Sequence, residues 1–269
     1  MHIFYQFPGN RNKALNFSID DGVLEDEHMV AIFNRYGIKG SFNLNSCQDD
    51  YPTRIRLSRE NIDRIYAGHE IACHTEYHPP LDMISRSEVI REMFGDRQRL
   101  EAASGRMITG FVYPNGHCSP ALAEIALAAG FEYARTTHSQ RELWYVPQDF
   151  FFWSPTCHYL EAPEFVEPFL CETRQLLTLF CIWGHSYEPE KNHQWDLIEK
   201  LCAKLGNRDD VWYATSLEIC RYVKAIRSLI FSADGKTVFN PSAVTVCFRT
   251  GGWEVKECIN IAPGETVTV

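Results

Sequence analysis

The sequence predicts an α/β barrel followed by a small β unit. Short apolar runs alternate with helix signals at least five times, which is typical of parallel strands joined by helices. After Ser228 no helix signal remains, and the following segments alternate between apolar and polar residues as half-exposed strands do. We therefore expect residues 1–227 to form one barrel domain. Residues 228–269 should form a β appendage packed on it, because a segment of that size rarely folds alone.

The first half of the chain shows these elements in order. A mostly apolar run over residues 14–19 predicts the first strand, and a helix over 25–36 follows and ends at Gly37. A second strand is expected over 39–44, and a second helix over 58–67 stops at Gly68.

Capping residues define the later helices. Ser85 and Glu88 form a capping box, in which each side chain satisfies a backbone amide of the other residue, ahead of a helix that reaches Gly105. A helix also begins at Ser119-Pro120, since proline is tolerated at the first helical position. Residues 215–218 cap the helix that ends near residue 227, and strands are then expected within 231–238, 244–249 and 265–269.

Two acidic residues follow the first strand, and two histidines occupy a similar setting further on. Asp20 and Asp21 precede Gly22, and His74 and His78 are four residues apart. One carboxylate and two imidazoles are a common ligand set for catalytic zinc or a similar divalent ion, and the second carboxylate can then take a proton from bound water. Each pattern also has a plain structural interpretation, as a turn and as a surface pair on a helix. Their position at predicted strand ends favours a site.

Five segments resemble, in order, the motifs of one family. They are residues 17–22 (Phe-Ser-Ile-Asp-Asp-Gly), 68–78 (Gly-His-Glu-Ile-Ala-Cys-His-Thr-Glu-Tyr-His), 111–116 (Phe-Val-Tyr-Pro-Asn-Gly), 183–185 (Trp-Gly-His) and 212–218 (Trp-Tyr-Ala-Thr-Ser-Leu-Glu). From about Leu15 to Val223 the chain thus resembles the polysaccharide deacetylase family, also called the NodB-homology domain or carbohydrate esterase family 4. The resemblance implies a distorted (β/α) barrel of the NodB-homology type.

The resemblance also implies a role for each matching residue. Asp21, His74 and His78 would bind the metal, Asp20 would be the general base, and His185 would be the general acid that protonates the departing amine. In this family the metal polarises an acyl carbonyl and activates the attacking water.

The third and fifth motifs imply the substrate contacts. Tyr113, Pro114 and Asn115 correspond to the third motif, and the backbone amide of Asn115 matches the one that holds the oxyanion in this family. Trp183 stands where the family has leucine beside the pocket for the acyl methyl group. A bulkier wall could narrow that pocket or change the acyl group accepted.

The third motif departs from the family pattern. Many members have an arginine that pairs with the catalytic aspartate, where this chain has Val112. Arg135, on the next predicted strand, could supply that charge from the adjacent barrel position. A surface arginine at a strand end is the alternative interpretation.

Bulk properties are those of an ordinary soluble enzyme. The formal net charge of −9 argues against nucleic acid and anionic membranes as partners. No apolar run approaches the ~18 residues of a membrane helix, and residues 1–8 lack the features of a signal peptide. The ten cysteines contain no Cys-x-x-Cys pair, which favours buried thiols in a reducing compartment. We expect a cytoplasmic protein, and the sequence predicts no oligomeric state.

The sequence therefore predicts a metal-dependent hydrolase that removes an N-acyl group, acetyl by preference, from an amino sugar or oligosaccharide. Zinc is the first choice of metal, while Co, Ni, Mn and Fe also suit an Asp-His-His ligand set. Two alternatives stay open. The same site could hydrolyse a small amide, ureide or formamide, or the chain could be a catalytically silent carbohydrate-binding protein.

Overall fold

The computed structural model describes residues 2–47, 52–174, 176–251 and 255–269. Its main body is a curled sheet of eight strands, in which all pairs of neighbouring strands are parallel. The order along the sheet is β6-β5-β4-β3-β2-β8-β7, and β9 also pairs with β2. The strands are β2 (Lys13–Asp21), β3 (Gly40–Leu44), β4 (Glu70–Cys73), β5 (Gly110–Val112), β6 (Tyr133–Arg135), β7 (Cys157–His158), β8 (Thr178–His185) and β9 (Val211–Tyr213).

One segment links the two edges of this sheet. Arg135 of β6 forms a parallel bridge with Trp153, and β7, a few residues later, pairs with β8. The chain from residue 153 to residue 158 therefore runs from one edge to the other and brings the sheet close to a closed barrel. The distorted barrel expected from the sequence is confirmed.

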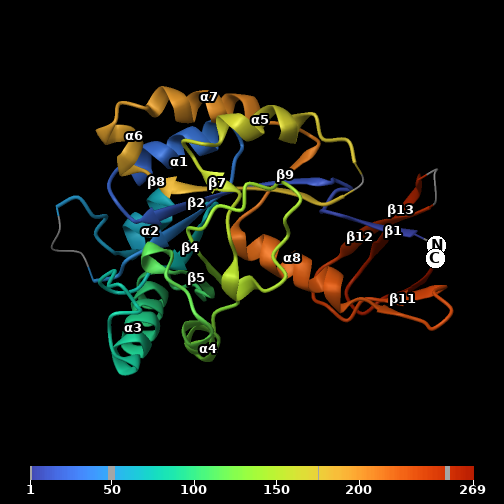
Figure 1. The fold of residues 1–269 in the computed structure, drawn as a ribbon, viewed down its shortest axis with the longest axis horizontal. Helices are drawn as coiled ribbons and strands as arrows, with labels where there is room; N and C mark the ends of the chain where they lie inside the picture. The colour runs from blue at the N-terminus through green and yellow to red at the C-terminus, as the bar shows by residue number, and fades with distance from the viewer. Residues whose placement is uncertain (1, 48–51, 175, 252–254) are drawn as a thin grey trace.

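Helices surround the barrel. Neighbouring helices pack in the order α5, α7, α1, α2, α3, α4, and Figure 1 shows α1, α5 and α7 on one side of the sheet with α3 and α4 on the other. The helices are α1 (Asp26–Arg35), α2 (Arg59–Ile65), α3 (Arg86–Ser104), α4 (Pro120–Ala128), α5 (Pro163–Leu170), α6 (Tyr187–Lys191), α7 (Trp195–Leu205) and α8 (Ser216–Ser228), with the short 3₁₀ turns η1 (Pro114–Gly116) and η2 (Phe150–Phe152). The capping boxes at Ser85 and Thr215 form as predicted. Among the described residues, no helix is both long and apolar enough to cross a bilayer.

The central strand β2 is buried over its whole length. Leu15, Phe17 and Ile19 belong to the apolar core that includes residues of α1, α2, α3 and α7. Because side chains alternate across a strand, residues 16, 18 and 20 face the barrel interior. There their polar groups bond to strands and loops around the barrel. The interior thus has a polar lining that leads to the end of β2.

The C-terminal segment forms two small antiparallel sheets, and Figure 1 shows them beside α8, at the end of the molecule where both termini lie. The strands are β10 (Ile230–Phe231), β11 (Thr237–Phe239), β12 (Val246–Gly251), β13 (Val255–Ile261) and β14 (Thr266–Thr268). The first strand, β1 (His2–Gln6), pairs with β12. Tyr222 of α8 links β1 and β12, because its hydroxyl donates to the Gln6 carbonyl at 2.7 Å and accepts from the Cys247 amide at 3.0 Å. The domain boundary at residues 227 and 228 stays a prediction.

A buried carboxyl group at the start of α1 should make stability depend on pH. Asp26 is fully buried and accepts hydrogen bonds from the Tyr66 hydroxyl at 2.7 Å and the Ser186 hydroxyl at 2.5 Å. Burial raises the pKa of Asp26 to about 7, whereas an aspartate in an unfolded chain has a pKa near 3.9. The folded protein thus binds this proton more tightly, so the contribution of Asp26 to the free energy of unfolding falls as the pH rises from about 4 to about 7.

Asp26→Asn should remove this fall, at about 1.4 kcal/mol for each unit of pKa shift. The measurement is urea unfolding of both proteins from pH 4.5 to 7.5 with chelator present. Asp196→Asn, at an exposed site on α7, is the control and should leave the pH profile unchanged. Parallel curves for the wild type and Asp26→Asn would contradict the prediction.

Candidate metal centre and catalytic residues

The predicted site residues lie at the carboxyl ends of neighbouring parallel strands. Asp20 and Asp21 end β2, and Asp20 is in register with His185 at the end of β8. His74 follows β4 directly, and Arg135 ends β6. Since the carboxyl ends of parallel strands meet at the same edge of a barrel, residues far apart in sequence come together here.

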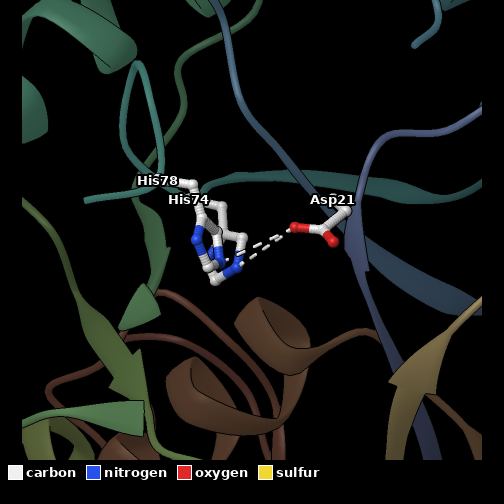
Figure 2. Close-up of side chains that lie close together, drawn as sticks. All are labelled: Asp21, His74 and His78. Carbon is white, nitrogen blue, oxygen red and sulfur yellow. Dashed lines mark ion pairs between the residues drawn. The ribbon is translucent and has the colours of Figure 1, made fainter. Parts of the chain in front are cut away.

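Asp21, His74 and His78 converge on one point (Figure 2). The Oδ1 atom of Asp21 lies 3.7 Å from Nε2 of His74 and 3.7 Å from Nε2 of His78. Two ligand atoms at about 2.1 Å from a tetrahedral cation lie about 3.4 Å apart, so a small inward shift would complete the coordination. Asp21 Oδ1 is also buried and has no hydrogen-bond partner among the described residues. A buried carboxylate oxygen that accepts no hydrogen bond and faces two imidazole nitrogens fits a divalent cation.

His74, which follows β4, is held in the tautomer that a metal requires. His74 Nδ1 lies 2.9 Å from the Val112 carbonyl, and because a carbonyl only accepts, the proton is on Nδ1 and Nε2 is left as a ligand. The His74 backbone amide donates to the carboxylate of Asp96 at 2.9 Å. Burial lowers the pKa of His74 to about 4, so the imidazole is neutral at pH 7, as metal binding needs.

Unusual backbone conformations gather at this site. Asp21, Thr75, His78 and Asn115 all have positive φ, at 87°, 69°, 58° and 56°. Such conformations cost on the order of 1–3 kcal/mol each in non-glycine residues and persist only where the surroundings enforce them. The turn after β2 and the loop after β4 therefore hold the three ligands in fixed positions.

Asp20 forms a buried ion pair with Arg135. The guanidinium Nη2 and the Asn43 amide, at 2.7 Å, both donate to Asp20 Oδ1. Arg135 Nε donates to the Ser18 hydroxyl at 3.0 Å, and both charged side chains are at most 2% exposed. Burial, the largest single influence, would raise the pKa of Asp20, but the charge and hydrogen bond of Arg135 together with the nearby histidines outweigh it, and the pKa is lowered.

The arginine comes from the strand beside the third motif. Val112 of β5 is in register with Arg135 of β6, so the guanidinium reaches Asp20 from one strand further along the barrel. The surface interpretation of Arg135 is wrong, because this side chain is among the largest fully buried ones.

His185 has an acidic partner that the sequence analysis missed. Its Nδ1 lies 3.3 Å from Oε2 of Glu188 on α6, and the same oxygen accepts the His185 backbone amide at 3.1 Å. His158 of β7 also reaches this oxygen, at 3.0 Å. Burial opposes a charge on His185, but the Glu188 carboxylate and the aspartates of β2 outweigh it and raise the pKa of His185. The three-residue spacing of His185 and Glu188 at a helix start was the available signal.

Other partners of the site carried no motif. Arg54, from the loop before α2, donates to the Asp21 carbonyl and lies 3.7 Å from Asp21 Oδ1. Asn43 and Asp96, described above, hold Asp20 and His74 from neighbouring elements. Each lies on another segment of the chain, and no spacing in the sequence links it to its partner.

The residues of the third and fifth motifs differ in burial and in their neighbours. The Tyr113 side chain is fully buried, and its hydroxyl donates to the Phe151 carbonyl at 3.1 Å. Pro114 is buried, whereas Asn115 is exposed at the tip of the turn. The Trp183 ring lies 5.3 Å from the guanidinium carbon of Arg135 and 4.9 Å from the His158 ring. Tyr113 and Pro114 therefore support the loop that carries Asn115, while Trp183 borders the site.

Comparisons with known proteins indicate the family and the fold. The sequence profile of the polysaccharide deacetylase family matches residues 9–134. No curated protein matches the chain significantly.

Solved structures with low identity share the fold. A Mycobacterium smegmatis protein assigned to the polysaccharide deacetylases has 16% identity and a TM-score of 0.61, over 82% of this chain and 93% of its own. Peptidoglycan deacetylase PdaC from Bacillus subtilis has 18% identity and a TM-score of 0.52, over 80% of this chain and 93% of its own. Puue allantoinase has 12% identity and a TM-score of 0.61, over 80% and 91%. These structures support the fold alone.

Arg135→Met should destabilise the protein by about 3–5 kcal/mol, because it leaves the buried charge of Asp20 without its partner. The pKa of Asp20 should also rise, which would move the acid limb of any activity profile to higher pH. Urea unfolding and a pH–rate profile measure the two effects.

Arg141→Met is the matched control, since Arg141 pairs with glutamates at the surface and is 47% exposed. This change should cost no more than about 1 kcal/mol. Equal losses of stability in the two variants would contradict the prediction that the Asp20–Arg135 pair stabilises the fold more than a surface pair does.

Proposed function

From the match of residues 9–134 to the polysaccharide deacetylase family, we propose that the chain is a metal-dependent hydrolase of N-acetylated amino sugars. The substrate would be an N-acetylated saccharide, either a single amino sugar or an oligosaccharide. The products would be acetate and the free amine.

The observation that carries this proposal is the different surroundings of two adjacent aspartates. Asp21 faces two imidazoles and has a buried oxygen that accepts no hydrogen bond among the described residues, whereas Asp20 faces Arg135 and Asn43 inside the barrel. The first environment suits a metal ligand. The second keeps a carboxylate ionised and fixed in place, which is what a general base needs.

A divalent cation held by Asp21, His74 and His78 would polarise the acyl carbonyl and lower the pKa of water. Asp20 would take the proton from the attacking water, and since both described donors reach Oδ1, Oδ2 is the oxygen available for it. The ion pair with Arg135 would keep the carboxylate in the orientation that proton transfer requires.

Two further groups would complete the reaction. His185 would protonate the departing nitrogen, because an amide anion is a very poor leaving group and a histidine with a raised pKa carries the proton it needs. The backbone amide of Asn115 would donate to the developing oxyanion. The strained turn that exposes Asn115 supports this role.

A small amide or ureide is the second candidate for the substrate. Trp183 favours it, since a bulky ring packed against Arg135 and His158 leaves less space beside the site than leucine would. Puue allantoinase, which shares the fold, is a relative of this kind by name. The match to the polysaccharide deacetylase family and the acidic pair favour the acetylated saccharide.

The test is acid release from N-acetylated chito-oligosaccharides, from N-acetylglucosamine and from allantoin, with and without chelator. We expect acetate release that chelator abolishes and that one equivalent of added metal restores. Metal content of the purified protein is measured in parallel. Hydrolysis of allantoin alone would move the protein to the second candidate, and bound metal without turnover on any substrate would contradict the deacetylase proposal.

A further inference from the structure

A second cluster of potential metal ligands includes the predicted general acid, His185. His158 ends β7, His185 ends β8, and Glu188 lies in the first turn of α6. Their ligand atoms all lie within 4.8 Å of one another. Glu188 Oε2 is 3.0 Å from His158 Nε2 and 3.3 Å from His185 Nδ1.

These distances match the ligand spacing of a transition metal. Ligands at about 2.1 Å from a cation lie about 3.0 Å apart at octahedral angles and about 3.4 Å apart at tetrahedral angles. Both contacts of Glu188 fall in this range, whereas the corresponding contacts of Asp21 are 3.7 Å. The donor set, two imidazoles and one carboxylate, is the same in the two clusters.

Hydrogen bonding alone does not satisfy this cluster. His185 Nδ1 is buried and has no hydrogen-bond partner of proper geometry among the described residues, although it lies beside the Glu188 carboxylate. The side chains of the three residues are 17–24% exposed, so an ion can reach them from solvent. Gly184 keeps a side chain away from this cluster, because a Cβ there would lie 3.3 Å from His158 Nε2 and 2.7 Å from Tyr159.

We propose that His158, His185 and Glu188 form a second divalent-cation site. Zinc binds there when it is in excess, and its binding inhibits the enzyme. The inhibition rests on the proposed role of His185. Zinc on Nδ1 displaces the proton carried there, and the neutral ring that remains keeps only its Nε2 hydrogen and no longer acts as an imidazolium acid. Binding therefore releases a proton and removes the general acid.

The experiment counts bound zinc independently of activity. Metal-stripped protein is dialysed against increasing zinc, bound metal is measured by mass spectrometry, and deacetylation is followed in the same samples. The wild type should bind two equivalents, the second more weakly. Deacetylation should fall at least about 100-fold as the second equivalent binds, the smallest loss typical of a missing general acid.

His158→Gln should bind one equivalent and escape the inhibition, because glutamine can still donate to Glu188 but is a poor zinc ligand. His28→Gln, at an exposed position on α1, is the matched control and should keep both equivalents. Glu188→Gln provides a second count of bound zinc if His158→Gln does not fold.

A wild type that binds only one equivalent, or a His158→Gln protein that still binds two, would overturn the second site. Acetate release with a single bound zinc would in that case leave the proposed function intact. Conversely, two equivalents in the wild type and one in His158→Gln, without turnover of any acetylated sugar, would support the cation site while the proposed function fails.

Discussion

The buried ion pair between Asp20 and Arg135 is the interaction around which the site is built. Two charges at most 2% exposed are stable only when both are paired and hydrogen-bonded. Asn43 and Ser18 supply those further bonds from the barrel interior. The polar residues of β2 thus extend a hydrogen-bonded interior up to the strand end, and they fix the position of Asp20 before any substrate arrives.

This pair separates the chemistry of two neighbouring carboxylates. Asp20 points into the barrel. Asp21, the next residue, has a positive φ, and its side chain faces the two histidines instead. One strand end therefore presents two acids with different partners. At the end of β8, Glu188 and the aspartates of β2 together raise the pKa of His185 against the effect of its burial.

Local sequence signals predicted the parts of the structure that local physics determines. The capping boxes at Ser85 and Thr215 and the change of character after Ser228 needed only neighbouring residues, and Arg135 was reached by counting strands from the third motif. Partners such as Asn43 were missed because their role depends on which strands become neighbours. The pairing of β1 with β12 was missed for the same reason, since the two strands are joined by almost the whole chain. The elements β7, α5, α6 and α7 were not assigned from the sequence. None of these three helices begins with a side-chain cap hydrogen bond, although Pro163 at the start of α5 and Gly206 after α7 were available signals.

The most direct test of the account compares Asp20→Asn with Asp21→Asn, in bound metal and in turnover. The account predicts that Asp20→Asn still folds and keeps one equivalent of metal, with a loss of stability because Arg135 stays buried without its partner. Its rate should fall at least about 100-fold, the effect expected for a general base. Asp21→Asn should lose the metal itself. If both variants bound metal equally well, or if Asp20→Asn retained its rate, the division of roles between the two aspartates would be wrong.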